Sequence, residues 1–315
     1  MKVLTVTLHP AVDRFIRVTQ LVPGQPANAD VLKVYSGGKG INAARTLHRL
    51  GVSTAATGFQ GGKTGEFCIE SLKREGIAAS FISCEQPTRV TTVIYETNSG
   101  NYYPIYEPRQ AVTKNETRQL IDHFEAMIGD FDLCLLCGAG EGPDAAQVYE
   151  RMIGLAAEKK VRCFLDSSGA ALANGLKAKP YLVKINLNEL AELIEKQLAG
   201  LDEQFEVLKR IVREGVKIAA VSNEEKGLVA TDGDHLFQSE LVLDRVRNTT
   251  GCGDAMLAGM ASAFLKGLPL SEIIRSGVAC GTANTQNLGA GFIDADLANA
   301  LLPEIEVRSV NKEED

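Results

Sequence analysis

A short stretch near the carboxyl end of the chain, NTTGCGDAMLAGM, combines an acid with a glycine-rich turn. Gly251 and Gly253 flank Cys252, Asp254 follows directly, and the remaining letters are typical of a helix. The NH groups at a helix N-terminus attract anions, so the backbone of this turn is suited to a phosphoryl group. A carboxylate at that point is placed to take a proton from an attacking hydroxyl. The alternative is structural, because aspartate is also a favoured helix N-cap.

Two further glycine-rich turns precede segments of helical period. SGGKGINAAR, residues 36–45, surrounds Lys39 with glycines, and it is either an anion-binding turn or a plain entry into a helix. GFQGGKTGE, residues 58–66, contains Gly-Lys-Thr but lacks the first glycine of a P-loop, because that position holds Thr57. We therefore interpret the second stretch as a turn beside a site.

Other polar spacings have structural explanations. Asn186 and Glu189 are three residues apart in KINLNEL, which on its own favours a helix capping box. Cys134 and Cys137 lie in one apolar run, where a strand would point them to opposite faces and into the core. The four histidines are scattered and show no metal-binding spacing.

Strand-like runs alternate with helical segments through most of the chain, which predicts a parallel sheet covered on both faces. The expected strands are KVLTVT, STAATGF, FDLCLLCG, KVRCFLD, PYLVKIN and VKIAAVS, with helices in the intervening stretches. Two segments, at about residues 13–36 and 86–107, break this pattern, because they contain strand-like runs without a helix. They predict a small antiparallel sheet that forms an interaction surface or a lid.

The composition of the 315 residues is that of an ordinary globular protein with a net charge of −7. It gives no basic surface for nucleic acid, so the positive charge that an anionic substrate needs must be local. Seven cysteines, an odd number without a disulfide pattern, predict reduced thiols and a cytoplasmic location. No apolar run reaches the length of a membrane span, and the N-terminal run is expected to be a strand rather than a signal.

Six motifs in order (TLHPAVD, SGGKGINAAR, GFQGGKTG, LDSSGAAL, VKINLNEL and NTTGCGDAMLAGM) resemble the ribokinase-like (PfkB) family of carbohydrate kinases. Within it they are most similar to the branch of 1-phosphofructokinases and tagatose-6-phosphate kinases. The resemblance implies one kinase domain over residues 1–315, with a three-layer α/β/α core, a mostly parallel sheet and a small β-sheet lid. It also implies phosphoryl transfer from ATP with Mg²⁺.

The resemblance assigns roles to residues of these motifs. It makes Asp254 the base that activates the sugar hydroxyl, and the NH groups of Gly251, Cys252 and Gly253 the cradle of the transferring phosphate. The positions that hold the sugar in this family match Asp13, Gly38, Lys39 and Asn42. Arg89 matches the position used against the phosphate that the substrate already carries, with Lys39 as its companion. Lys184 faces the ATP phosphates, and Asn186 and Glu189 bind Mg²⁺ through water. The resemblance also implies contacts with the nucleotide from Ser222, Gly227, Gly281 and Asn284.

The sequence departs from this branch at several positions. His9 replaces the usual Asn, Ile185 the usual Pro, and Glu224 a Gly in the nucleotide loop, while CGAGEGPD replaces the common GSLP segment. Glu224 places a side chain and a negative charge where backbone normally approaches ATP. Cys252 replaces the common Ala at a helix N-terminus, where the pKa of a thiol tends to fall. It is either a small packing residue or the site of an oxidative switch.

Two substrates fit these motifs: fructose 1-phosphate, phosphorylated on its 6-hydroxyl, and tagatose 6-phosphate, phosphorylated on its 1-hydroxyl. We favour the first. The alternative from another class is a non-catalytic sensor of sugar phosphate or nucleotide, prompted by Glu224 and the altered GSLP segment, although a sensor needs no base. A nicotinamide-dependent oxidoreductase lacks its early Gly-x-Gly-x-x-Gly. The exposed edges of the lid make a homodimer through the lid a further expectation.

Overall fold

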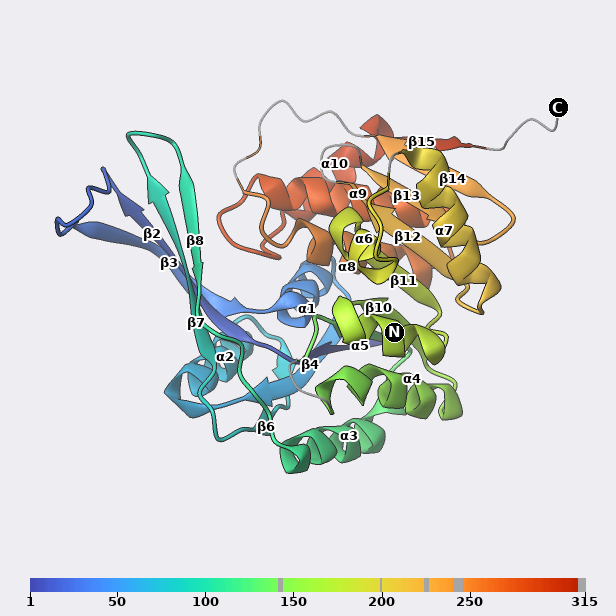
Figure 1. Ribbon diagram of the computed structural model, residues 1–315, viewed down its shortest axis with the longest axis horizontal. Coiled ribbons are helices and arrows are strands. Elements are labelled where there is room, and N and C mark those ends of the chain that lie inside the picture. Colours follow the sequence, from blue (N-terminus) through green and yellow to red (C-terminus); the bar gives the residue numbers. More distant parts are fainter. Residues whose placement is uncertain (141–143, 199, 224–226, 241–245, 247, 311–315) are drawn as a thin grey trace.

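The computed structural model describes residues 1–140, 144–198, 200–223, 227–240, 246 and 248–310. Its centre is a large sheet between two layers of helices, and a second, smaller sheet projects from one side (Figure 1). This arrangement confirms the expected α/β/α core with a mostly parallel sheet and a β-sheet lid.

The central sheet has the strand order β15-β14-β13-β12-β11-β10-β9-β1-β4-β5, and β6 pairs with β4. Strands from β12 to β5 are parallel, while β13, β14 and β15 extend the sheet in antiparallel fashion. The bounds are β1 (Lys2–Thr7), β4 (Ser53–Gln60), β5 (Ala78–Ala79), β6 (Ile82–Ser83), β9 (Leu133–Cys137), β10 (Arg162–Asp166), β11 (Leu182–Asn186), β12 (Ile218–Ser222), β13 (Leu228–Thr231), β14 (Leu236–Glu240) and β15 (Glu306–Ser309).

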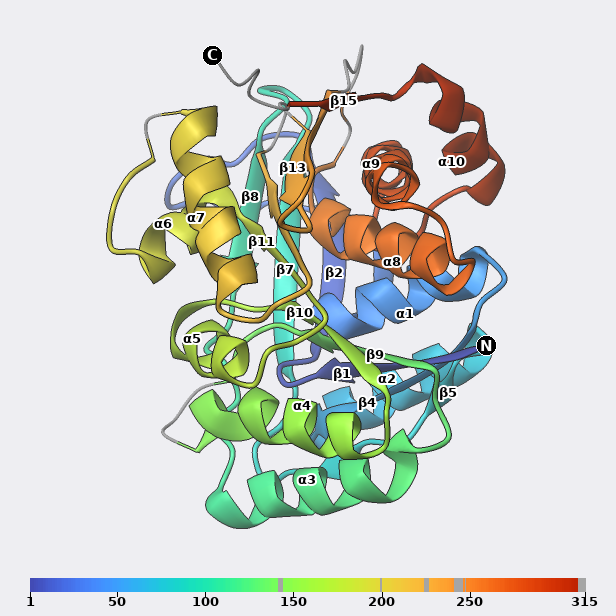
Figure 2. The same cartoon turned by 90° about the vertical axis from the view of Figure 1, so that its right-hand side faces the viewer.

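Helices cover both faces of this sheet. One layer contains α1 (Lys39–Arg49), α2 (Gly62–Arg74), α8 (Cys252–Leu265), α9 (Leu270–Thr285) and α10 (Ala295–Leu301). The other contains α3 (Lys114–Ile128), α4 (Val148–Glu158), α5 (Gly169–Lys177), α6 (Leu187–Leu193) and α7 (Leu201–Arg213). Figure 2 shows α8 between α1 and α9. None of the helices described is both long and apolar enough to cross a membrane.

The strands are apolar on both sides because both faces are buried. In β1, Val3 packs toward α1 and α8, whereas Leu4 and Val6 pack toward α3 and α4. The same alternation separates the two cysteines of β9: Cys134 belongs to the core on the α3 side and Cys137 to the core on the α1 side. Both are buried, which confirms their interpretation as packing residues.

The lid consists of β2 (Ala11–Val18), β3 (Ala29–Gly37), β7 (Arg89–Glu96) and β8 (Tyr102–Tyr106) in the order β3-β2-β7-β8. The two outer pairs are antiparallel, but β2 and β7 are parallel, so the expectation of an antiparallel sheet is wrong at its centre. The reason is that both central strands leave the core at the same end. β2 follows β1 and β7 follows β6, and each runs outward from the carboxyl edge of the core (Figure 1).

Candidate active site

A cavity of about 970 Å³ lies between the lid and the carboxyl ends of the central strands. Strands β10, β11 and β12 end there in Asp166, Asn186 and Ser222, which is where parallel sheets usually bind ligands. The cavity is lined by nearly all the residues that the sequence singled out: Asp13, Gly38, Lys39, Asn42, Arg89, Lys184, Asn186, Ser222, Gly227, Gly251, Cys252, Gly253, Asp254 and Gly281.

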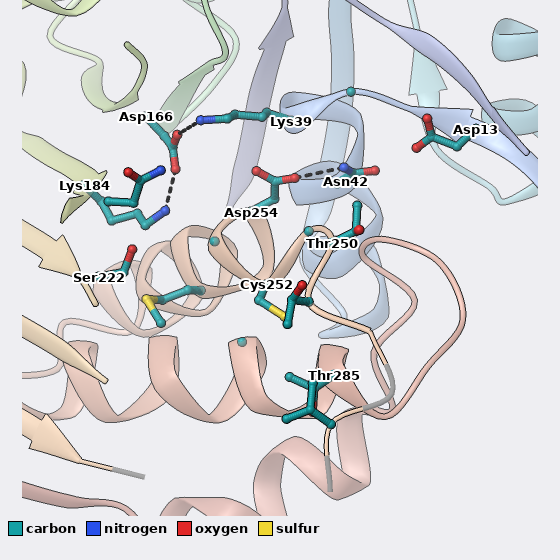
Figure 3. Close-up of a pocket in the computed structure, with 18 of the residues that line it drawn as sticks. Asp13, Lys39, Asn42, Asp166, Lys184, Ser222, Thr250, Cys252, Asp254 and Thr285 are labelled. Carbon is teal, nitrogen blue, oxygen red and sulfur yellow. Dashed lines mark hydrogen bonds and ion pairs between the residues drawn. The ribbon is translucent and has the colours of Figure 1, made fainter. Parts of the chain in front are cut away.

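Asp254 lies at the third position of α8 and is almost fully buried. The N-cap of that helix is Gly251, so the reading of Asp254 as a cap is wrong. Its Oδ2 accepts a hydrogen bond of 2.8 Å from the side-chain amide of Asn42 on α1 (Figure 3). Burial, and then the nearby carboxylate of Asp166, raise the pKa of Asp254 to about 6. A base is most effective with a pKa close to the working pH, so this environment suits proton abstraction.

Two glycines make this helix start possible. Gly251 has a φ of 81°, and a Cβ on it would lie 2.4 Å from the Cβ of Ala290. A Cβ on Gly253 would lie 2.7 Å from the ammonium nitrogen of Lys184. The first glycine therefore permits the left-handed turn into α8, and the second lets a cation approach the helix N-terminus.

A chain of ion pairs lies beside the N-terminus of α8. Asp166 accepts from Lys39 and from Lys184, each at 2.7 Å, and Lys39 also contacts Glu189 at 2.9 Å (Figure 3). Burial acts to raise the pKa of Asp166, but the two lysines outweigh it and lower the pKa to about 2. Burial likewise acts to lower the pKa of Lys39, and the surrounding carboxylates hold it above its ordinary value. The ion pairs therefore hold both lysine side chains in position.

This geometry changes the role expected for Lys39. Its ammonium group points to Asp166 and Glu189, on the side of Lys184, rather than serving as the companion of Arg89. Lys39 therefore joins Lys184 in the ion pairs around Asp166.

Asn186 and Glu189 form the capping box that their spacing favoured. The Asn186 side chain accepts from the Glu189 NH, and the Glu189 carboxylate accepts from the Asn186 NH, both at 2.9 Å. Within the described residues, no three His, Cys, Asp or Glu side chains form a direct metal site. The donor set fits Mg²⁺ in its usual hydrated form, held by one or two carboxylates together with substrate phosphates.

Asp13 reaches the cavity from the lid. It lies on β2 opposite Thr91 of β7, whose side chain gives it a hydrogen bond. A Cβ on Gly37 would lie 2.0 Å from Oδ2 of Asp13, so the carboxylate rests directly on the backbone of β3. Burial raises the pKa of Asp13 to about 7. Thr91 is a cavity residue that the sequence analysis missed.

The expected nucleotide residues divide into two groups. Ser222, Gly227 and Gly281 line the cavity. Asn284 has no exposed surface and lies behind the wall, where its amide donates to the carbonyl of Thr250 and its oxygen accepts from the Gly291 NH. Asn284 is thus placed to support the turn that contains Thr250. Glu224, and residues 141–143 of the altered GSLP segment, lie outside the described residues.

Asp166 is the main functional residue that the sequence analysis missed. It occurs within LDSSGAAL, where it was part of a family motif without a role. A usable signal was present, because an acid that ends a buried apolar strand lies at the carboxyl edge of a parallel sheet. What the sequence could not supply is that two lysines, from α1 and β11, would meet there.

Comparison with known proteins agrees with this geometry. The model of the pfkB family carbohydrate kinases matches residues 6–296. The chain belongs to the pfkB family of carbohydrate kinases. It is 28% identical to the 1-phosphofructokinase of Bacillus subtilis, over 97% of this chain and 99% of that protein.

Two solved pfkB-family structures are similar over nearly their whole length. One is the tetrameric inhibited form of phosphofructokinase-2 from Escherichia coli, with a TM-score of 0.89 and 27% identity, covering 96% of this chain and 98% of that one. The other is a possible 1-phosphofructokinase from Thermotoga maritima, with a TM-score of 0.87 and 25% identity, covering 99% and 100%. The chain is thus a sugar kinase, which decides against the non-catalytic sensor.

Proposed function

We propose that this kinase transfers a phosphoryl group from ATP to a ketohexose phosphate and forms a 1,6-bisphosphate. Fructose 1-phosphate, phosphorylated on its 6-hydroxyl, is the favoured substrate, and tagatose 6-phosphate is the alternative. One observation carries the proposal: a carboxylate with a raised pKa lies in the first turn of α8, so a base and an anion-binding helix N-terminus meet at one point.

The reaction begins with the acceptor hydroxyl beside Asp254. The Asn42 hydrogen bond occupies Oδ2 and fixes the plane of the carboxylate, so Oδ1 is the oxygen that accepts the hydroxyl proton. The sugar oxygen forms a bond to the γ-phosphorus of ATP, the bond from that phosphorus to the β,γ-bridging oxygen breaks, and ADP leaves. The proton remains on Asp254 until it is lost to solvent. Most of the acceleration comes from positioning and charge stabilisation, as is general for phosphoryl transfer.

The phosphate chain of ATP is assigned to the wall formed by Lys184, Ser222, Gly227 and Gly281, next to the N-terminus of α8. In this part of the site two ammonium groups contact the carboxylates of Asp166 and Glu189, and both are close enough to act electrostatically on that of Asp254. Because the lysines are already paired with acids, a polyphosphate needs a further cation. Glu189 and Asn186 would hold Mg²⁺ through water, and the bound ion would neutralise negative charge on the phosphates.

The choice between the two ketohexose phosphates rests on the relatives. The similar curated proteins include 1-phosphofructokinases from two bacteria, at 27–28% identity. The cavity itself must hold a phosphate at the Arg89 end and a hydroxyl at the Asp254 end, a demand that both substrates meet. We therefore favour fructose 1-phosphate on the similarity to those proteins.

A coupled assay of ADP formation tests the proposal with fructose 1-phosphate, tagatose 6-phosphate, fructose 6-phosphate and fructose. The two 1,6-bisphosphate-forming substrates are expected to give the highest kcat/KM. Asp254→Asn is expected to lower kcat by about 10²-fold or more while ATP binding stays nearly unchanged. Absence of turnover with every phosphorylated ketohexose would refute the proposed function, and a near-normal kcat for the variant would refute the assigned base.

Two further parts of the proposal concern the protein in the cell. All seven cysteines are free thiols, which supports a reducing, cytoplasmic location. Exposed apolar side chains on the two edge strands of the lid support a homodimer formed through it, among them Val31 on β3 and Ile105 on β8.

A further inference from the structure

Arg45 on α1 is a charged side chain that the fold buries almost completely, with 1% of its surface exposed. Its Nε and Nη2 both donate to the carboxylate of Glu75, Nη2 at 3.0 Å. Nη2 also donates to the carbonyl and hydroxyl oxygens of Ser36, at 2.7 and 2.9 Å. A buried charge is tolerated when it is paired and hydrogen-bonded in this way, and the paired guanidinium group is held in one plane.

The remaining nitrogen of Arg45 faces the active site. Nη1 donates to Oδ1 of Asn42, one turn earlier on α1, at 3.4 Å. A guanidinium group has only donors, so the oxygen of the Asn42 amide turns toward it and the amide nitrogen turns away. That nitrogen donates to Oδ2 of Asp254 at 2.8 Å (Figure 3). Arg45 therefore determines which end of the Asn42 amide faces the carboxylate.

The direction of this amide matters for the ionisation of Asp254. An NH group that donates to a carboxylate favours its charged form, whereas an amide oxygen in the same place would disfavour it. Burial raises the pKa of Asp254, and the hydrogen bond from Asn42 opposes that rise. The same bond engages Oδ2 and leaves Oδ1 for the acceptor hydroxyl. The orientation of Asn42 thus bears directly on the proposed base.

The same guanidinium group also contacts the support of the α8 N-terminus. Nη1 donates to the carbonyl of Ala290 at 3.0 Å, and the group lies over the ring of Phe292 at 4.3 Å from its centre. Ala290 lies directly against the N-cap of α8, because a Cβ on Gly251 would be 2.4 Å from the Ala290 Cβ. One buried side chain therefore fixes both the amide beside the base and the residue on which the anion-binding turn rests.

We propose that Arg45 is a positioning residue of the phosphoryl transfer: its guanidinium group fixes the amide of Asn42, which in turn orients the carboxylate of Asp254 for proton abstraction. This proposal rests on the proposed function, because it takes Asp254 as the base. The alternative is a structural role, in which Arg45 only stabilises the fold through Glu75 and Ser36. A structural role predicts lower stability without a change in the ionisation of Asp254.

A titration of Asp254 separates these two roles. Carbon-13 NMR of labelled aspartate carboxyl groups measures its pKa, with the spectrum of Asp254→Asn to assign the resonance. Arg45→Lys keeps the charge but loses the fork that reaches several acceptors at once, so the pKa of Asp254 is expected to rise by about one pH unit. The control is Arg49→Lys, one turn further along α1, where the arginine donates to the carbonyl of Ile293 at 3.1 Å and the pKa of Asp254 should not change.

The other groups that act on Asp254 are the same in wild type and in both lysine variants. They are Asp166 on β10, Lys39 on α1, Lys184 on β11, Asp13 on β2 and the thiols of Cys137 and Cys252. Burial raises the pKa of Asp13 and the charge of Arg45 opposes that rise, but lysine retains this charge. A shift confined to Arg45→Lys therefore reports the loss of the hydrogen-bonded geometry.

Kinetics tests whether Arg45 acts through Asn42. With fructose 1-phosphate, Arg45→Lys is expected to lower kcat about tenfold at pH 7 and to move the acid limb of the pH profile to higher pH, with KM for ATP changed by less than about threefold. Arg45→Lys added to Asn42→Ala should lower kcat no further than Asn42→Ala alone, because both changes remove the same restraint. Additive losses in the double variant would overturn the proposed route through Asn42.

Folding and turnover are checked separately. Glu75→Gln leaves the arginine in place and weakens its hold, so it is expected to raise the pKa of Asp254 by a smaller amount, and it carries the test if Arg45→Lys does not fold by circular dichroism. An unchanged pKa of Asp254 in the folded variants would refute the role of Arg45. A wild-type protein that phosphorylates no ketohexose phosphate, but shows the shift, would refute the proposed function and leave the orientation of Asp254 by Arg45 standing.

Discussion

At the scale of single residues, the environment that suits Asp254 to its proposed role as the base also makes it costly to the fold. Its carboxylate is buried near that of Asp166, and its pKa of about 6 lies above the ordinary value near 3.8. A carboxylate with a raised pKa is less favourable when ionised in the folded protein than in the unfolded chain. Active-site groups are often tuned at the expense of stability in this way.

Replacing this acid is therefore expected to stabilise the protein. Above pH 6 the native state carries the unfavourable charge, so Asp254→Asn should raise the free energy of unfolding by roughly 2 kcal/mol at pH 8. The gain should shrink as the pH falls from about 6 toward 4, because the wild-type carboxyl then becomes protonated in the folded state. Urea denaturation at pH 8 and pH 5 measures both values, with the exposed Asp122→Asn as control. A variant less stable than wild type at pH 8 would contradict the raised pKa.

A second residue-scale prediction concerns Cys252. The helix N-terminus was expected to lower the pKa of its thiol, but burial outweighs that effect and raises the pKa above its ordinary value. The sulfur also accepts from the Asn284 amide at 3.4 Å. Its alkylation by iodoacetamide at pH 7 is thus expected to be slower than that of a free cysteine in solution, because the thiolate is the reactive form. Mass spectrometry measures the modification. Rapid modification of Cys252, or a loss of peroxide sensitivity in Cys252→Ala, would instead support the hypothesis that oxidation of this thiol switches the enzyme off.

The sequence predicted individual residues better than it predicted their partners. Motif letters located Asp254, Arg89 and Lys184, each of which lines the cavity. They did not reveal that Lys39 turns to Asp166, since a motif contains no information on the direction of a long side chain.

At the scale of secondary-structure elements, the contact between α8 and β11 joins the proposed phosphate-binding turn to the ammonium group of Lys184. Gly253→Ala would place a methyl group 2.7 Å from the Lys184 nitrogen, which is held by Asp166 and cannot easily retreat. Displacement of the ammonium group should lower kcat/KM for ATP about 10- to 100-fold, the effect of losing a charged hydrogen bond. Steady-state kinetics measures this loss. The control is Gly154→Ala on α4, where a Cβ meets no neighbour within 4 Å and activity should be unchanged; equal activity of the two variants would argue against the contact.

The types of the secondary-structure elements could be predicted from the sequence, but the pairing of β2 with β7 could not. Alternating apolar strands and helices predicted the layered core, and runs without a helix predicted the lid. The parallel pairing of β2 with β7 depends on where each strand leaves the core, and residue patterns along one strand do not record that. The capping box of Asn186 and Glu189, in contrast, could be predicted, because it depends only on residues close together in the sequence. The ion pair between Glu189 and Lys39 could not, because Lys39 is distant in the sequence.

At the scale of the whole molecule, an acidic chain binds anionic substrates by concentrating positive charge locally. The net charge of −7 repels phosphates at long range. Within the site, the N-terminus of α8 and Arg89 supply positive charge locally, whereas the two lysines are already paired with carboxylates. Substrate capture should accordingly depend on contacts within the cavity more than on long-range steering.

The lid provides the prediction for assembly. It projects from the core (Figure 1), and its edge strands expose Val31 and Ile105, each more than half accessible. Burial of these side chains against a second lid would drive dimer formation, so Ile105→Lys is expected to shift a dimer to monomer. Light scattering coupled to size-exclusion chromatography measures the mass, and Leu268→Lys, an exposed leucine on the core, is the control that should remain dimeric. A monomeric wild type, or a dimer that both variants leave intact, would show that the lid is not the interface.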